Sequence, residues 1–207
     1  MKAIKLCGLT GENDVRVARE LGAEFAGFVF AESPRRVDPG RAAELRRGFD
    51  GSRTRVVGVF AGEDPERIRE IVREVRLDLV QLHGGTGGNP CGVPVIRALK
   101  VRGGKPAPAP AGERPEWYLL DAYDPVVEGG SGRPFDWGAA RSLDLPRPFL
   151  LAGGLTAESV GRAIAALRPD GVDVSSGIEE NPGVKSEYEM RRFVAAARAA
   201  FDEGERE

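Results

Sequence analysis

Residues 148–177 read PFLLAGGLTAESVGRAIAALRPDGVDVSSG and hold a pattern that recurs along the chain. Two short apolar runs, 148–152 and 171–174, lack the polar alternation of a strand exposed on one face, and a helical pattern lies between them. Strands that are apolar on both faces and are joined by a helix are typical of a parallel sheet with right-handed crossovers. The stretch therefore predicts one strand–helix–strand unit of an α/β protein.

The same unit recurs over nearly the whole chain. Helical patterns with one apolar face begin near Asp14, Asp38, Asp64, Thr156 and Ser186, and most of these residues are typical helix caps. Eight apolar runs in 207 residues fit an eight-stranded parallel β/α (TIM) barrel, which usually needs about 200 to 250 residues. We therefore expect a single barrel domain over residues 1–207. The eight runs are 3–7, 25–30, 55–60, 78–82, 93–98, 117–121, 148–152 and 171–174.

Two connections depart from this pattern. HGGTGGNPCG at 83–92 is too short and too rich in glycine for a full helix, and VRGGKPAPAPAGERP at 101–115 is interrupted by prolines. We expect shortened or irregular fourth and fifth connections. An open sheet that binds a dinucleotide is disfavoured, because residues 7–11, CGLTG, lack the G-x-G-x-x-G spacing after the first strand.

The composition is that of an ordinary globular protein, with 41% hydrophobic residues and 30 Lys and Arg against 32 Asp and Glu. A net charge of −2 gives no basic field for nucleic acid or anionic lipid, and no apolar stretch reaches the roughly 20 residues of a membrane span. Two cysteines, Cys7 and Cys91, are too few for a disulfide framework. We expect a cytoplasmic monomer or homodimer that acts on a small molecule, without nucleic-acid or membrane partners.

Polar residues gather where the predicted strands end, which is where barrels of this kind build their active sites. A thiol, a carboxylate, an arginine and two glycine-rich turns at one mouth indicate proton transfer on an anionic substrate. One histidine without a Cys or His partner at ligand spacing argues against a metal site. The residues at the strand ends are Cys7, Arg35, Arg36, His83, Asp121, Gly153, Gly154, Ser175, Ser176 and Gly177.

The turns after the last two strands predict a phosphate site. Gly153-Gly154 is followed by a helical pattern, and Ser175-Ser176-Gly177 lies at the matching point one unit later. Backbone N–H groups and the helix dipole favour a dianion at a helix N-terminus, and glycine allows the backbone to approach it closely. Plain βα turns are the competing interpretation.

Cys7 and Asp121 are the candidate base and acid, although a buried core cysteine and a loop carboxylate are the ordinary alternatives. Amides near Gly8 and Thr10 are expected to lower the pKa of the thiol. Burial behind residues 118–120 is expected to raise the pKa of Asp121, so that the carboxyl starts protonated.

Seven short motifs occur in the order and at the spacing expected of successive strand ends. They are Lys5-Leu6-Cys7-Gly8-Leu9-Thr10, Gly27-Phe28-Val29-Phe30 with Ser33-Pro34-Arg35, Gly58-Val59-Phe60, Val80-Gln81-Leu82-His83-Gly84, GGSGRPFDW at 129–137, Leu151-Ala152-Gly153-Gly154-Leu155 and Asp173-Val174-Ser175-Ser176-Gly177-Ile178-Glu179. Together they resemble the phosphoribosylanthranilate isomerase family of tryptophan biosynthesis, and the resemblance covers nearly the whole chain.

The resemblance implies an Amadori rearrangement of N-(5-phosphoribosyl)anthranilate, with neither a metal nor an organic cofactor. By position, Cys7 resembles the family's general base, Asp121 its general acid and Arg35 its ligand for the anthranilate carboxylate. Arg36 remains an alternative to Arg35, because the preceding loop is one residue shorter than the family's pattern. The remaining residues assigned to substrate binding are His83, Gly153, Gly154, Asp173, Ser175, Ser176 and Gly177.

Three other functions remain as alternatives. A pentose-phosphate epimerase would need metal-binding histidines, which one His does not supply. An isomerase that also serves histidine biosynthesis would carry phosphate sites in both barrel halves. A catalytically inactive barrel used as a binding subunit would not need both Cys7 and Asp121.

Overall fold

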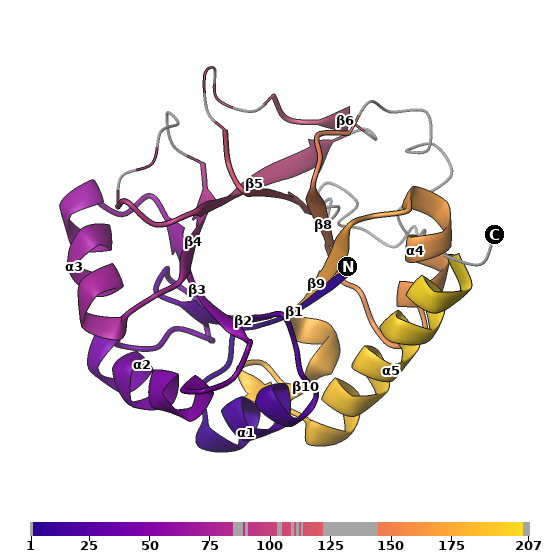
Figure 1. Cartoon of the computed structure of the whole chain (residues 1–207), viewed down its shortest axis with the longest axis horizontal. Helices are drawn as coiled ribbons and strands as arrows, with labels where there is room; N and C mark the ends of the chain where they lie inside the picture. Colours follow the sequence, from indigo (N-terminus) through magenta and orange to yellow (C-terminus); the bar gives the residue numbers. More distant parts are fainter. Residues whose placement is uncertain are drawn as a thin grey trace.

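The structure is a computed structural model that describes residues 2–84, 89, 91–102, 105–108, 110, 112, 114–121 and 145–204. Eight parallel strands form a closed barrel, as predicted from the apolar runs (Figure 1). Around the barrel the order is β4, β3, β2, β1, β9, β8, β7 and β5, and pairing of β4 with β5 closes the ring. The strands are β1 (Ala3–Cys7), β2 (Phe25–Val29), β3 (Arg55–Ala61), β4 (Leu79–His83), β5 (Val95–Arg102), β7 (Trp117–Asp121), β8 (Phe149–Ala152) and β9 (Gly171–Val174).

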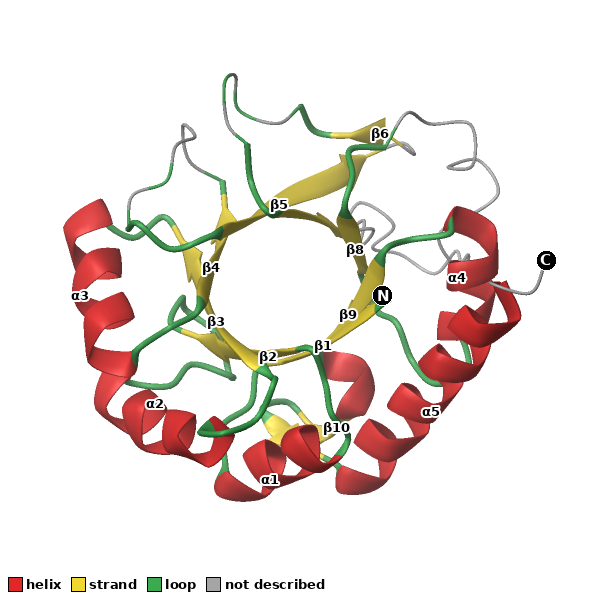
Figure 2. Cartoon of the chain, viewed as in Figure 1, coloured by secondary structure: helices red, strands yellow, loops and turns green. Residues whose placement is uncertain are grey.

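Helices pack on the outside of this ring (Figure 2). Among the described residues these are α1 (Glu12–Glu20), α2 (Pro39–Arg46) with the short η1 (Arg47–Phe49), α3 (Pro65–Val75), α4 (Val160–Leu167) and α5 (Glu187–Gly204). Their apolar faces join the outward residues of the strands in one continuous core. As expected, Asp38 caps α2 and Asp64 caps α3 by accepting a hydrogen bond from a first-turn amide.

The predicted start of the fourth of these helices is wrong. Thr156 was expected as its cap, but α4 begins at Val160 and its N-cap is Ser159. The amide of Thr156 donates to Ser159 Oγ at 2.9 Å, and the Thr156 carbonyl accepts from the amide of Val160 at 3.0 Å. These bonds form a separate turn, which delays the helix.

The two unusual connections differ in structure. In the described part of the first, Asn89 Oδ1 accepts from the amides of Cys91 and Gly92, which makes a turn and not a helix. In the second, β5 extends into the proline-rich stretch and β6 (Lys105–Pro106) pairs back on it antiparallel. Part of the expected irregular loop is therefore a short hairpin, with proline on an edge strand where its missing N–H is tolerated. The motif at 129–137 lies outside the described residues.

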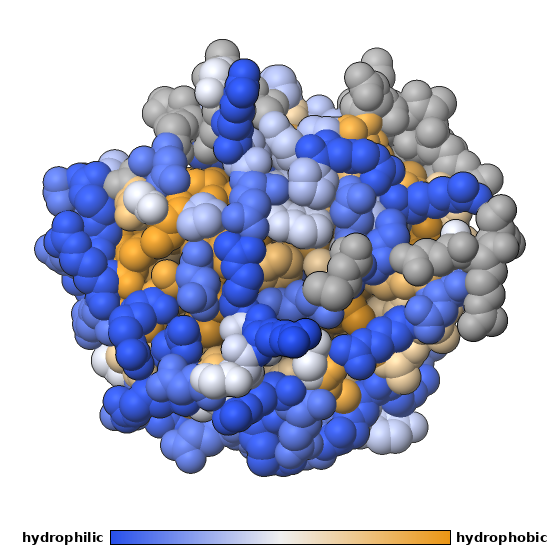
Figure 3. Space-filling model, in the orientation of Figure 1, coloured by the Kyte–Doolittle hydropathy of each residue, from blue (hydrophilic) through white to orange (hydrophobic). Residues whose placement is uncertain are grey.

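The inside of the barrel changes from apolar to polar along the strands. Strand residues alternate between the helix side and the interior, so Ala3, Lys5 and Cys7 of β1 share the inner face. Around Ala3 the interior is an apolar layer, and the polar side chains lie at the opposite, carboxyl ends of the strands. In the view of Figure 3 the outer rim is largely hydrophilic, and hydrophobic residues show between its side chains. The apolar layer contains Ala3, Phe25, Val57, Leu79, Ile96, Leu119, Leu150 and Ala152.

Candidate active site

The candidate base and acid lie at one end of the barrel. Cys7 ends β1 and Asp121 ends β7, and β9 and β8 lie between these two strands. Both residues continue the alternation of inward-facing positions below them. Cys7 is buried, with 6% of its surface exposed, whereas Asp121 is half-buried. The buried Leu119 and Leu120 precede Asp121 in β7, as the sequence predicted.

Gly27 of β2 leaves the space that the thiol of Cys7 occupies. The two residues are paired in register, and a Cβ atom at position 27 would lie 2.8 Å from Cys7 Sγ and 3.2 Å from its Cα atom. Real Cβ atoms essentially never make contacts shorter than 3.0 Å, so the contact with Sγ excludes a side chain here unless the sulfur moves. The glycine therefore fixes where the sulfur sits between the two strands.

The amides that were expected to lower the pKa of Cys7 are used elsewhere. The amides of Gly8 and Leu9 donate to the carbonyl of Gly27, and those of Thr10 and Gly11 donate to the Asp14 carboxylate. Burial raises the pKa of the Cys7 thiol, and attraction to Lys5 lowers it by a smaller amount. The expected net lowering is wrong, because desolvation of the thiolate outweighs the favourable charges.

Lys5 and Asp173 form an ion pair inside the barrel. Lys5 Nζ lies 2.6 Å from Asp173 Oδ1, and the lysine side chain has no exposed surface. The two residues are register partners on β1 and β9. Burial lowers the pKa of Lys5, but Asp173 and Cys7 outweigh it and the pKa is raised. Lys5 is therefore a charged group beneath Cys7 that the sequence analysis did not single out.

Arg35 faces the site and is held by a second ion pair. Its Nε atom lies 2.7 Å from Glu179 Oε1 and its Nη2 atom 2.8 Å from Glu179 Oε2, a bidentate arrangement. Lys185 Nζ lies 2.7 Å from the same Glu179 Oε1. Arg36 is exposed and Arg35 is half-buried. A Cβ atom at Gly8 would lie 2.7 Å from Arg35 Cδ, so Arg35 lies against the turn that follows Cys7.

Glu179 and Lys185 come from a small hairpin that the apolar runs did not predict. Its strands are β10 (Glu179–Asn181) and β11 (Val184–Lys185), which follow a short 3-10 helix, η4 (Ser176–Ile178). Burial acts to raise the pKa of Glu179, but hydrogen bonds from Arg35 and Lys185 outweigh it and the pKa is lowered. The carboxylate is therefore charged between two cations.

The two predicted phosphate turns lie side by side after β8 and β9. Gly153 and Gly154 have φ angles of 105° and 65°, which favour glycine. A Cβ atom at Gly177 would lie 1.9 Å from the carbonyl oxygen of Leu155, so the second turn packs directly on the first. Ser176 and Gly177 belong to the three-residue η4. The helix N-terminus expected immediately after Gly153-Gly154 is wrong, because α4 begins only at Val160.

His83 ends β4 at the same mouth. Its Nε2 atom lies 2.7 Å from Gln81 Nε2, and Gln81 Oε1 has no hydrogen-bond partner among the described residues. Burial lowers the pKa of His83, and the charge of Lys5 lowers it further. The imidazole is therefore neutral at pH 7, with the Gln81 amide donating to it in this arrangement.

Comparison with known proteins agrees with this architecture. The model of the N-(5'-phosphoribosyl)anthranilate (PRA) isomerase family matches residues 4–196. The chain belongs to the PRA isomerase family. An N-(5'-phosphoribosyl)anthranilate isomerase of Syntrophomonas wolfei is 42% identical over 197 residues, which cover 94% of this chain and 96% of the relative. The resemblance deduced from the seven motifs is thereby confirmed.

Solved structures of the PRA isomerase family share the barrel. The enzyme from Thermotoga maritima superposes with a TM-score of 0.81 at 35% identity, covering 96% of this chain and all of that one. A phosphoribosyl anthranilate isomerase in complex with reduced 1-(o-carboxyphenylamino)-1-deoxyribulose 5-phosphate superposes with a TM-score of 0.77 at 31% identity, with coverage of 96% and 100%. The predicted TIM barrel is confirmed.

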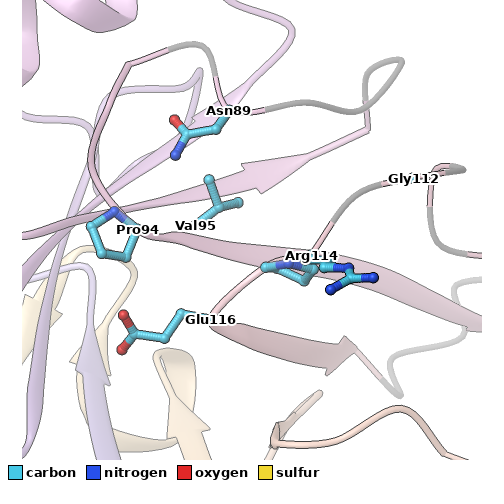
Figure 4. Close-up of a pocket in the computed structure, with 7 residues that line it drawn as sticks. Asn89, Pro94, Val95, Gly112, Arg114 and Glu116 are labelled. Carbon is cyan, nitrogen blue, oxygen red and sulfur yellow. The ribbon is translucent and has the colours of Figure 1, made fainter.

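A hollow of about 400 Å³ lies at the other end of the barrel (Figure 4). Pro94 and Val95 line it where β5 begins, and Pro115 and Glu116 line it just before β7. It is therefore separate from the polar mouth, where the strands end. No three His, Cys, Asp or Glu side chains of the described residues are grouped to hold a metal ion. Nor does any helix in the described part of the chain have the length and apolarity needed to cross a membrane.

Proposed function

We propose that this chain catalyses the Amadori rearrangement of N-(5'-phosphoribosyl)anthranilate to 1-(2-carboxyphenylamino)-1-deoxyribulose 5-phosphate, as a cytoplasmic enzyme of tryptophan biosynthesis. The observation that carries the proposal is the family match over residues 4–196. In this barrel Cys7 and Asp121 are the last residues of β1 and β7, and both face inward at one mouth. The whole chain acts as one phosphate-binding barrel domain, as a monomer or a homodimer.

Cys7 and Asp121 divide the proton transfers between them. Asp121 donates a proton to the ring oxygen of the ribose, the bond from that oxygen to C1' breaks, and the anthranilate nitrogen supplies the electron pair of the resulting iminium ion. The iminium makes the proton on C2' acidic, and the Cys7 thiolate removes it. The enol-amine that remains becomes the keto product when its C2' hydroxyl loses a proton and C1' gains one. A positioned acid and a positioned base each contribute roughly 10²- to 10⁴-fold to the rate.

Two remote contacts hold the reacting carbons between these groups. The phosphate binds the backbone N–H groups of the turns at Gly153-Gly154 and Ser175-Ser176-Gly177, and Lys185, whose Nζ atom donates to the carbonyl of Ser175 at 2.9 Å, adds a positive charge nearby. The anthranilate carboxylate binds Arg35, and His83 and Asp173 face the same mouth. Binding energy at both ends of the substrate then fixes its position relative to Cys7 and Asp121.

The test is the loss of substrate fluorescence on addition of the pure protein, with the unstable substrate made in situ. Cys7→Ala and Asp121→Asn are each expected to lower kcat by about two orders of magnitude or more, because each removes one partner of the proton transfer. Binding of a reduced product analogue persists in both variants. Cys91→Ala is the matched control, since Cys91 lies in the connection before β5. This variant is expected to keep the wild-type kcat. The mechanism is wrong if Cys7→Ala keeps more than about a tenth of the wild-type kcat.

A further inference from the structure

Lys5 is a charged residue in the interior of the barrel that takes no direct part in the proposed proton transfers. Lys5 has no exposed surface, and an ammonium group is unfavourable in such a place unless it is paired. Asp173 Oδ1, 2.6 Å from Lys5 Nζ, supplies one partner. An ammonium group has three N–H donors, so this contact alone does not use its full capacity.

Cys7 is the next residue after Lys5 on the inner face of β1. The two residues are separated by one position on β1, so their side chains leave the same face of the strand about 6.5 to 7 Å apart at Cα. The positive charge of Lys5 favours the Cys7 thiolate. Asp173 acts on Cys7 in the opposite sense.

Other charged groups face the same thiol from neighbouring elements. The charge of Lys185 in β11 favours the Cys7 thiolate. Arg35, which follows β2, is attracted electrostatically to the same thiolate. Glu179 of β10 is bound between these two cations, which reduces the effect of both. His83 of β4, Lys100 of β5 and Asp121 of β7 also lie at this mouth, where Lys100 and Asp121 are register partners. The side chain of Lys185 is as fully buried as that of Lys5. Lys5 differs because it lies on the same strand as Cys7 and because, among the ion pairs of the described residues, no second cation shares its partner Asp173.

We propose that Lys5 is a positioning residue for the reaction: held by Asp173 beneath the mouth, its ammonium group is the counter-charge that stabilises the Cys7 thiolate. The inference rests on the proposed role of Cys7 as the base, and it adds the group that makes this role possible in a buried site. The carboxylate of Asp173 then has two effects, because it orients Lys5 and also weakens the favourable charge near the sulfur.

This arrangement predicts opposite effects for the two members of the ion pair. Lys5→Met keeps most of the side-chain volume but removes the cation, so the Cys7 thiolate forms at higher pH. Asp173→Asn removes the anion and leaves Lys5 in place, so the thiolate forms at lower pH. A merely structural ion pair would give no such opposition, because either substitution would disturb the same packing.

The experiment measures thiolate formation directly, from its ultraviolet absorbance during a pH titration. All variants carry Cys91→Ala. The absorbance of each variant is corrected by subtracting that of the same protein with Cys7→Ala added, so that the difference comes from the Cys7 thiolate alone. Lys5→Met is expected to raise the midpoint by about one pH unit or more, the usual effect of a unit charge at close range. Asp173→Asn lowers the midpoint, and Lys5→Arg stays near the wild type. Lys2→Met is the control, since Lys2 precedes β1 at the opposite end of the barrel, where its Nζ atom donates to the carbonyl of Pro169.

Turnover gives a second readout. Lys5→Met is expected to lower kcat about tenfold at neutral pH, because a midpoint raised by one pH unit reduces the thiolate fraction about tenfold. Part of this loss should be recovered at alkaline pH, and KM should change little. An unchanged midpoint in Lys5→Met, or shifts of the same sign in Lys5→Met and Asp173→Asn, would overturn the inference. If Lys5→Met does not fold, as judged by circular dichroism, Asp173→Asn decides alone, and a midpoint that does not fall refutes the inference. Full activity of Cys7→Ala would instead refute the proposed role of Cys7 and leave the titration result intact.

Discussion

Arg35 and Glu179 form a side-on ion pair in which Nε and Nη2 of the guanidinium contact the two carboxylate oxygens at 2.7 and 2.8 Å. A guanidinium has five N–H donors, and this pair uses two of them. The edge formed by Nη1 and the other Nη2 hydrogen lies outside the pair, and it has the geometry of a second fork. Glu179 thus orients Arg35 while leaving it able to bind another carboxylate.

Arg35→Lys should therefore raise KM by about tenfold or more, because lysine keeps the charge and loses the planar fork. The measurement is steady-state turnover of the fluorescent substrate. Arg36→Lys is the control, since Arg36 is exposed, and its KM should stay near the wild-type value. A larger effect at Arg36 would place the carboxylate ligand one residue further along the chain.

Gly27→Ala should lower kcat by about tenfold or more, because the new methyl group would meet both Sγ and Cα of Cys7 and move the base away from the substrate. Gly161→Ala is the matched control. In α4 a Cβ atom at position 161 meets only Ala200, at an ordinary 3.8 Å, so activity is retained. Wild-type kcat in Gly27→Ala would mean that the position of the sulfur is not critical.

Gly154→Val should raise KM strongly, since a branched side chain projects where the phosphate is proposed to bind and the φ angle of 65° strains it. Gly51→Val is the control that separates backbone strain from obstruction of the phosphate site. Gly51 has a φ angle of 74° and open space around it, but it lies after η1, away from the mouth. The control should lose stability and keep its KM. An unchanged KM in Gly154→Val would contradict the phosphate assignment, and crystals grown from sulfate should show an anion at this turn.

Cys7 also makes stability depend on pH. Burial keeps the pKa of its thiol above the ordinary value in the folded protein, so above a pH of about 8.5 the unfolded chain loses this proton first. The folded state then binds more protons than the unfolded state, and the free energy of unfolding falls as pH rises, by at most about 1.4 kcal/mol per pH unit from this group. Urea denaturation between pH 8 and 10 should show a shallower decline in Cys7→Ala than in the wild type. Equal slopes would show that the thiol has no raised pKa.

Local sequence features were sufficient for the barrel and for some of the residues at its mouth, but not for Lys5, Glu179 or Lys185. The eight apolar runs predicted the eight strands, because a strand buried on both faces must be apolar throughout. Asp38 and Asp64 marked two helix starts through their capping chemistry. The start of α4 was misplaced because Thr156 and Ser159 are both capping residue types, and only the turn between them decides which one is used. The hairpin of β5 and β6 was missed because its edge strand is only two residues long.

The strand–helix order, the family and the choice of Cys7, Asp121 and Arg35 as candidates followed from the order of the residues, since these depend on neighbouring residues and on motifs. Which charged side chains pair with one another depended on how the chain folds. Lys5 and Asp173 are 168 residues apart in the chain, and Arg35 and Glu179 are 144 apart. Closure of the barrel places β1 beside β9, and only then does the desolvation of Cys7 compete with the charge of Lys5. A pKa depends on burial and on distances between charges, and no local pattern contains either.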